Sequence, residues 1–267
     1  MIPSLAALRI RDRIERRRPD SPRHAPIYKR WLAACNGLDS KQNACGRIPL
    51  FTPWKRLDSN DKMQFHKTID LSENDRYWGG QYETPYDGKD VDRVLSATEP
   101  RDKWSVEHVV PRSKINGRAP GRAENDWLGW DLATRGANSE RGNLPLVLWP
   151  SPSMPVGRVQ ISGDRDHFNP IEEHKDRLAR RWMFVRATYS PIERISEPSN
   201  SQKKHADTII ELCSTNGPSY AEERLHLFLV ELAKREFGIA WTNPLIDKNK
   251  KHEFLKDDEF KKLVFGP

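Results

Sequence analysis

Cysteine is scarce in this chain of 267 residues. There are three cysteines, Cys35, Cys45 and Cys213, and no Cys-x-x-Cys pair. A small, odd number of cysteines argues against a disulfide framework and against a cysteine-rich zinc site. Cys35 and Cys45 could pair, but a reducing compartment fits the count better. We therefore expect a cytoplasmic protein that does not use zinc.

Long hydrophobic runs are also missing. No stretch approaches the ~20 apolar residues that a membrane-spanning helix needs. The first apolar run, from Leu5 to Leu8, is too short for a secretory signal. Nine tryptophans, nine phenylalanines and six tyrosines are nevertheless enough to build a core, and low-complexity disorder would not contain so many aromatic residues. We expect a folded, soluble protein with no membrane partner.

Positive charge is unevenly distributed. The chain has a formal net charge of +7, and residues 1–30 hold nine basic against three acidic residues, a net of +6. This block is typical of an arm that binds phosphates, although a solvated helix face explains it equally well. We expect nucleic-acid contacts from Arg13, Arg16, Arg17 and Arg18 in this arm, and from Arg112 and Lys114 further along.

Hydrophobic spacing and capping residues predict a chain that is mainly helical. The expected helices cover residues 4–18, 28–34, 58–68, 171–187, 220–237 and 258–264. Residues 76–111 have the composition of short strands and turns, and the strand at 104–110 should end at Pro111. We divide the chain into a basic helical region (1–60), a central region (61–190) and a C-terminal helical region (191–267). Residues 191–202 could form a linker or a surface loop.

Two short motifs contain the residues of greatest chemical interest. The first is Glu107-His108-Val109-Val110-Pro111, and the second, about thirty residues later, is Asn138-Ser139-Glu140-Arg141-Gly142-Asn143. Hydrolysis of a phosphodiester needs a base to activate water and a divalent cation to stabilise charge. A strand directs adjacent side chains to opposite sides, so an acid can face a metal while the next residue, a histidine, faces water. One carboxylate and one amide, with water, make a usual Mg²⁺ site.

These motifs resemble the ββα-metal nucleases, also called His-Me finger or HNH-like nucleases, and most of all the bacterial endonuclease I family. That family has Glu-His-x-x-Pro on a strand and Asn-x-x-Arg-x-Asn on a helix. Asp126 lies twelve residues before Asn138, where the family has an aspartate. The resemblance covers roughly residues 65–250 and is specific over 104–146. It departs from the family at Leu128, where the family has a histidine, and in its shorter loop. The broader HNH pattern fits as well.

The resemblance implies a role for each motif residue. His108 would be the general base, and Glu107 and Asn138 would bind Mg²⁺ or Mn²⁺. Arg141 and Asn143 would support the site, and Arg118 or Arg122 would hold phosphate. Asn125, Asp126 and Asp131 are alternatives for the residue that orients His108. The fold implied is α+β: an antiparallel hairpin and a crossing helix, beginning near Asn138, within a mostly helical body.

We therefore expect an endonuclease that cuts DNA, with duplex favoured and RNA open. Because a non-specific cytoplasmic DNase would damage its own genome, low sequence specificity with restraint by a partner protein, as in phage defence, or by timing is expected. The alternatives are a sequence-specific restriction or homing enzyme, and a nucleic-acid-binding protein without catalysis. We interpret His167 and His174 as surface residues, and Trp127, Trp130 and Trp149 as core.

Overall fold

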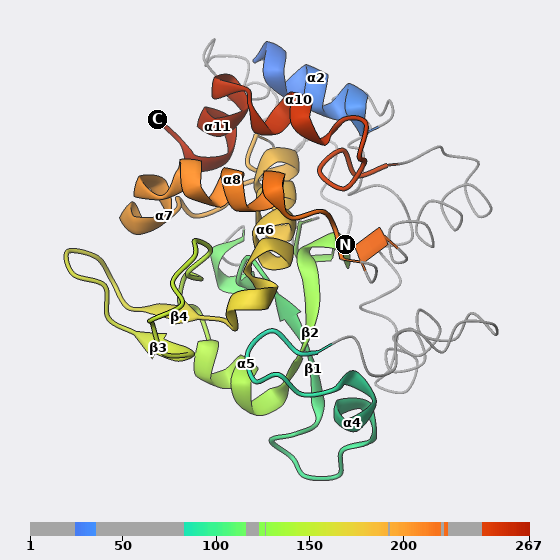
Figure 1. Cartoon of the computed structure of the whole chain (residues 1–267), viewed down its shortest axis with the longest axis vertical. Coiled ribbons are helices and arrows are strands. Elements are labelled where there is room, and N and C mark those ends of the chain that lie inside the picture. Colours follow the sequence, from blue (N-terminus) through green and yellow to red (C-terminus); the bar gives the residue numbers. More distant parts are fainter. Residues whose placement is uncertain are drawn as a thin grey trace, which may run out of the picture.

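A computed structural model describes residues 25–35, 83–115, 123–125, 127–191, 193–219, 222–223 and 242–267. These residues form helices and two small antiparallel sheets (Figure 1), which confirms the α+β class. The α-helices are α2 (Pro26–Ala34), α4 (Val91–Ser96), α5 (Arg135–Arg141), α6 (Lys175–Tyr189), α7 (Asn200–Lys204), α8 (Ala206–Thr215), α10 (Lys251–Leu255) and α11 (Asp258–Phe265). The strands are β1 (Trp104–His108), β2 (Trp130–Thr134), β3 (Gly157–Val159) and β4 (His167–Asn169). Short 3-10 helices are η4 (Arg112–Lys114), η5 (Ala123–Asn125), η6 (Trp127–Gly129) and η7 (Glu172–His174).

Strands β1 and β2 form the larger antiparallel pair. In its register Glu107 lies opposite Asp131, and His108 lies opposite Trp130. The strand predicted over 104–110 is therefore shorter, and ends at His108. Pro111 follows in the same segment and has no amide hydrogen to donate, so it cannot extend the ladder.

Helix α5 follows β2 without a connecting loop. The hydroxyl of Thr134, the last residue of β2, accepts a hydrogen bond from the Ala137 amide at 3.2 Å. This cap satisfies an amide of the first turn, so the helix begins at Arg135 and not near Asn138 as predicted. The helix ends at Gly142, whose φ of 51° is easily adopted only by glycine.

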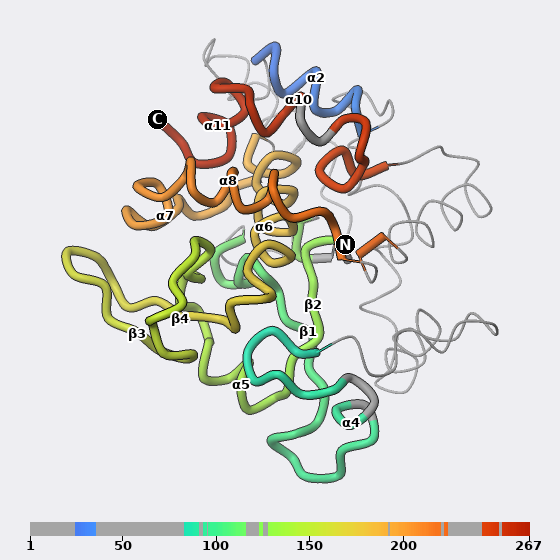
Figure 2. The backbone as a smooth tube through the Cα atoms, viewed as in Figure 1, coloured from blue at the N-terminus to red at the C-terminus, as the bar shows by residue number. Residues whose placement is uncertain are grey.

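Helix α6 lies at the centre of the molecule. It contacts α2, α8 and α11 on one side and η6, next to β2, on the other (Figures 1 and 2). Trp31 of α2 packs against Phe184 of α6 and against Phe254 and Phe260 of the C-terminal helices, with ring centroids 5.2–6.2 Å apart. Helices from the outer parts of the chain thus share one core around α6. The division into three regions stays a prediction.

Helix α6 is buried on all sides, which its sequence does not suggest. Its interior residues include four arginines, Arg177, Arg180, Arg181 and Arg186, as well as apolar side chains. A buried arginine is stable only where acceptors or negative charges surround it. The polar groups that meet these arginines therefore determine how the parts of the molecule pack against α6.

Beside this core, the structure favours one of two open alternatives, and one prediction is wrong. Ile195 pairs with Ile115 in an antiparallel bridge and Ser199 and Gln202 are buried, so residues 191 and 193–202 fit the loop alternative and not the linker. His167 is not a surface residue: its ring is fully buried, and its Nε2 atom lies 2.8 Å from the Ser199 hydroxyl. The segment that reads as a loop is held by this buried contact.

Other predictions on secondary structure have different outcomes. The helices predicted over 28–34 and 258–264 are confirmed as α2 and α11, and Trp130 and Trp149 are buried as expected. The helices predicted over 4–18, 58–68 and 220–237 lie wholly or almost wholly outside the described residues, as does the side chain of Trp127. None of the helices within the described ranges is long and apolar enough to cross a membrane.

Candidate active site

Helix α5 crosses one face of strand β1. Ser105 and Glu107 share that face, because side chains alternate along a strand, and His108 lies on the other side. Asn138 Nδ2 donates a hydrogen bond to Ser105 Oγ at 2.8 Å. Three residues later on the helix, an Arg141 guanidinium nitrogen lies 3.0 Å from Glu107 Oε1. The two motifs, about thirty residues apart in sequence, are therefore in contact.

Arg141 is an interior residue that binds the end of β1. Its side chain is 2% exposed. Besides its ion pair with Glu107, it donates hydrogen bonds to the main-chain oxygens of His108, at 3.1 Å, and Val109, at 2.8 Å. These bonds fix the backbone on both sides of the His108–Val109 peptide. Arg141 thus has a positioning role and does not present its charge to solvent.

Tyr86 also binds Glu107. Its hydroxyl donates a hydrogen bond of 2.6 Å to Glu107 Oε1. A tight turn supplies this tyrosine: the Thr84 hydroxyl donates to Asp87 at 2.6 Å, and Gly88 adopts a φ of 61°. Short turns are predicted within residues 76–111, and this turn is one of them. The contact of Tyr86 with Glu107 could not be predicted, because nothing in the local pattern refers to a strand 21 residues away.

Burial controls the protonation of Glu107. Its side chain is completely enclosed, and this desolvation raises its pKa from 4.5 to about 7. Arg141 and the hydrogen bond from Tyr86 act in the opposite direction, while nearby Asp131 adds to the rise. Oε2 of Glu107 is buried and has no hydrogen-bond partner among the described residues. A further positive charge at Oε2 would stabilise the carboxylate.

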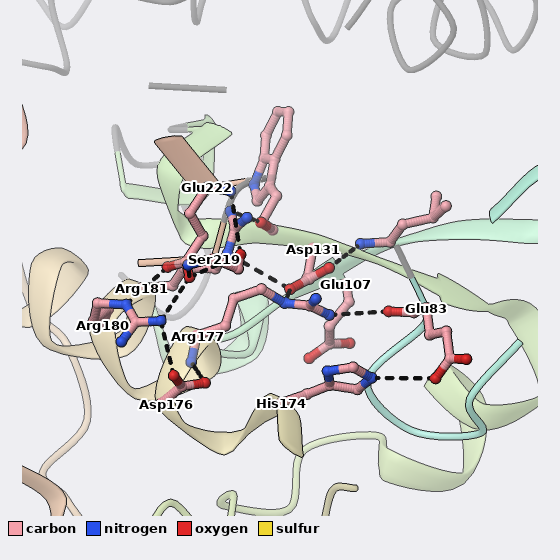
Figure 3. Close-up of polar contacts among 12 residues, drawn as sticks. Glu83, Glu107, Asp131, His174, Asp176, Arg177, Arg180, Arg181, Ser219 and Glu222 are labelled. Carbon is pink, nitrogen blue, oxygen red and sulfur yellow. Dashed lines mark hydrogen bonds and ion pairs between the residues drawn. The ribbon is translucent and has the colours of Figure 1, made fainter. Parts of the chain in front are cut away.

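Asp131 of β2 belongs to a buried ionic network with arginines of α6 (Figure 3). Its Oδ2 atom accepts from Arg177 Nε at 3.0 Å and lies 3.5 Å from Arg181 Nε. Because Asp131 is opposite Glu107 in the register, it shares the face of Glu107 and not that of His108. Asp131 therefore does not orient His108.

A main-chain oxygen contacts the ring of His108. Nε2 of this half-buried ring lies 3.1 Å from the carbonyl oxygen of Glu124, which also accepts from Trp130 Nε1 at 3.1 Å. A carbonyl can only accept, so Nε2 carries the hydrogen and Nδ1 of the neutral ring carries the lone pair. Sequence reasoning missed this partner, because side-chain identity does not encode a carbonyl. The side chain of Asn125 and all of Asp126 lie outside the described part.

The surface beside the site has several polar side chains. Arg112 Nε donates to Glu124 Oε1 at 2.8 Å, although most of the arginine side chain is exposed. The Ser113 hydroxyl donates to Asn143 Oδ1 at 2.7 Å, on the outer surface. The side chain of Lys114 has no partner in the described ranges. The remaining expected phosphate-binding residues, Arg13, Arg16, Arg17, Arg18, Arg118 and Arg122, lie outside those ranges.

Two oxygen atoms near the α5–β1 contact are of the kind that binds a divalent cation. Asn138 Nδ2 also donates to the Val106 carbonyl at 3.0 Å, which fixes the orientation of the amide. Asn138 Oδ1 and Glu107 Oε2 then have no partner among the residues that the structure describes. Hard carboxylate and amide oxygens, completed by water, suit Mg²⁺ or Mn²⁺. This pair is smaller than a cluster of three or more His, Cys, Asp or Glu, of which the described residues contain none.

The chain matches no family model, no curated protein and no solved structure. The resemblance of residues 104–146 to the endonuclease I family therefore stays a prediction. The contacts between β1 and α5 are therefore the basis for inferring the function of this protein.

Proposed function

We propose that this protein is a divalent-metal-dependent endonuclease in which β1, β2 and α5 form a ββα-metal core. The contact of α5 with the end of β1 carries the proposal, because it gathers an acid, a histidine, an amide and an arginine within one hairpin-helix unit. Each motif alone is common in proteins without catalytic function. Their contact in space supports a single site for phosphodiester hydrolysis.

His108 acts as the general base. The Glu124 carbonyl keeps the hydrogen on Nε2, so the lone pair on Nδ1 accepts a proton from the water that attacks phosphorus. The imidazolium that forms keeps its hydrogen bond to the same carbonyl. Arg141 holds the main-chain oxygen of His108 and so limits movement of the ring. A positioned base of this kind contributes roughly 10²–10⁴-fold to the rate.

Glu107 and Asn138 would hold the cation, Mg²⁺ or Mn²⁺. When bound, it would neutralise the negative charge that develops on the phosphate and on the leaving oxygen. Tyr86 and Arg141 fix one oxygen of Glu107, which leaves Oε2 as a single carboxylate donor. Positive charge at Oε2 would favour the deprotonated acid, against the burial that raises its pKa to about 7.

The proposed substrate is DNA, with duplex favoured and RNA included in the test. The fixed base and cation donors act on the phosphodiester and do not by themselves distinguish the two nucleic acids. Phosphate contacts add affinity without reading sequence. We therefore propose low sequence specificity and restraint by a partner or by timing. A sharp consensus at sequenced cut sites would favour a restriction or homing enzyme instead.

The test compares the protein with its His108→Ala variant on supercoiled plasmid in Mg²⁺. We expect the unaltered protein to give nicked or linear product, and chelator to stop the reaction. His108→Ala should lower the rate at least ~100-fold, because it removes the general base, while DNA affinity in chelator stays unchanged. Glu107→Ala and Asn138→Ala should lower activity, and the loss should be partly reversed by more Mg²⁺.

His205→Ala is a matched control. His205 is half-buried like His108, and each ring lies against a tryptophan, Trp149 for His205 and Trp130 for His108. This control should retain activity. Cleavage that persists in chelator, or that is equal in both variants, would exclude the mechanism. A gel shift without any cleavage would mean a binding protein and not an enzyme.

A further inference from the structure

A pocket opens immediately beyond His108. Its walls are residues 109–111 after β1, the segment after α5, the β3–β4 loop, α6 and residues 196–198. Three cationic residues line it in addition to Arg141: Lys114, Arg165 and Arg186. They come from three separate parts of the chain, so their convergence is a property of the fold.

Two of these cations are tied to the same residue, Ser196. Its amide donates to the main-chain oxygen of Lys114 at 2.9 Å, and Arg186 donates to the main-chain oxygen of Ser196 at 2.8 Å. The adjacent bridge between Ile115 and Ile195 keeps the two segments together. The backbone of Lys114 and the guanidinium of Arg186 are therefore fixed around one strand-like segment.

Buried hydrogen bonds hold the third cation beside that segment. The ring of His167 contacts the main-chain oxygen of Arg165 through Nδ1 at 2.7 Å and the Ser199 hydroxyl through Nε2 at 2.8 Å. Asp164 accepts from the Ser201 amide at 2.7 Å. The β3–β4 loop is thus attached to the start of α7, and the backbone of Arg165 is fixed next to the pocket.

The positive charge of the pocket is only partly balanced. Arg186 is 4% exposed, and its guanidinium donates to the main-chain oxygens of Val264 and Ser196. It forms no ion pair with a carboxylate among the described residues, and burial lowers its pKa to about 10, although the charge of Glu197 opposes this shift. Glu197 is the one acid among the described lining residues, and it lies 3.4 Å from Lys203 Nζ.

The two remaining cations, Lys114 and Arg165, have no side-chain partner in the part of the chain that the structure describes. Arg141 in the pocket wall is already paired with Glu107. A concave site with one buried cation and two unpaired ones favours an anion, because a bound negative charge would compensate all three.

We propose that this pocket binds a backbone phosphate of the nucleic acid strand that passes His108. The inference rests on the proposed function and extends it to a defined phosphate site. Lys114 is six residues from His108, so the two Cα atoms lie at most ~20 Å apart. At 3.4 Å of rise per nucleotide, that is within about six nucleotides of the cleaved bond. The pocket therefore fixes the register of the substrate and contributes affinity without sequence specificity.

The test measures the affinity of a fluorescent DNA duplex and of a single-stranded RNA by anisotropy, in chelator so that no cleavage occurs. Compared with the unaltered protein, the Lys114→Ala/Arg165→Ala variant should bind roughly tenfold more weakly. The slope of log affinity against log salt should fall by about one, for one lost phosphate contact. Arg165→Lys in place of Arg165→Ala should restore about half of the loss, because it returns one of the two removed charges.

The matched control is Lys256→Ala/Lys262→Ala, which removes the same charge from exposed positions just after α10 and on α11, away from the β3–β4 loop (Figure 1). Equal affinity of the pocket and control variants, or a loss of thermal stability without a loss of affinity, would overturn the inference. If the unaltered protein nevertheless cuts plasmid in Mg²⁺, the nuclease proposal stands alone. If it neither binds nor cuts DNA or RNA, both proposals fail.

Discussion

The two ends of α6 bury arginines in different surroundings. Near its start, Arg180 is enclosed with Glu222, with nitrogen–oxygen distances of 2.9 and 2.6 Å, and Arg177 is enclosed with Asp131 (Figure 3). Near its end, Arg186 donates to main-chain oxygens and lies over the ring of Trp182, and it forms no ion pair with a carboxylate among the described residues. Burial disfavours the charge of Glu222, but Arg180 outweighs this effect and lowers its pKa. The paired arginines are thus structural, whereas the charge of Arg186 suits a ligand that is not part of the chain.

The largest effect should follow from breaking a complete pair. Arg180→Met leaves Glu222 buried without its cation, and we expect a loss of about 3–5 kcal/mol in the free energy of unfolding, measured in urea. The Arg180→Met/Glu222→Met variant should recover much of it, because the enclosed carboxylate is removed together with its cation, while the more exposed Asp176 keeps its hydrogen bond from the Arg177 amide. Arg158→Met breaks an exposed pair with Asp166, at 2.6 Å, and should cost less than about 1 kcal/mol. Equal losses of unfolding free energy in Arg180→Met and Arg158→Met would contradict the view that the buried pair is the structural one.

A smaller loss of unfolding free energy is expected near the C-terminal end of α6, at Arg186. Arg186→Met removes hydrogen bonds to two carbonyls but also removes a buried charge that has no carboxylate partner among the described residues. The expected loss is about 1–2 kcal/mol, well below that of Arg180→Met, by the same urea titration. A loss as large as that of Arg180→Met would mean that Arg186 is a structural residue like the others.

The smallest expected effect is the contribution of His174 to the pH dependence of stability. Burial lowers the pKa of His174 below 6.5, and Arg177 adds to the shift, while Asp131, Glu83 and Glu173 oppose it. The folded state therefore favours the neutral ring. Its contribution to stability is complete above pH 6.5 and is lost as the pH falls through the lowered folded pKa. Urea midpoints between about pH 8 and pH 5 should fall less steeply for His174→Gln than for the unaltered protein. If the urea midpoints of His174→Gln and of the unaltered protein fell equally with pH, His174 would not contribute to the pH dependence of stability.

The sequence predicts those elements whose pattern is local. Helices α2 and α11 are confirmed because the hydrophobic spacing of α2 and the Asp257 cap of α11 lie within or next to each segment. The α+β class, in contrast, is implied by the family resemblance. The predicted start of helix α5 is three residues late, because the helix cap is a threonine that also ends a strand. The burial of His167, Ser199 and Gln202 depends on packing against distant segments, so the local polarity of these residues misleads.

The candidate site was predictable only as a list of residues. The motifs name Glu107, His108, Asn138 and Arg141, and the structure brings them together. Their partners could not be predicted: Tyr86 comes from a separate turn, and the Glu124 carbonyl has no side-chain signature. The charge state of Glu107 also depends on enclosure, which is a tertiary property.

The bonds of Arg141 have a consequence for the motions of the molecule. One guanidinium links α5 to the Glu107 carboxylate and to two consecutive carbonyls at the end of β1. The end of β1 cannot separate from α5 without exposing this buried charge, so opening one should require opening the other. Amide hydrogens of β1 and α5 should then exchange with solvent as one cooperative unit, slower than those of the β3–β4 loop.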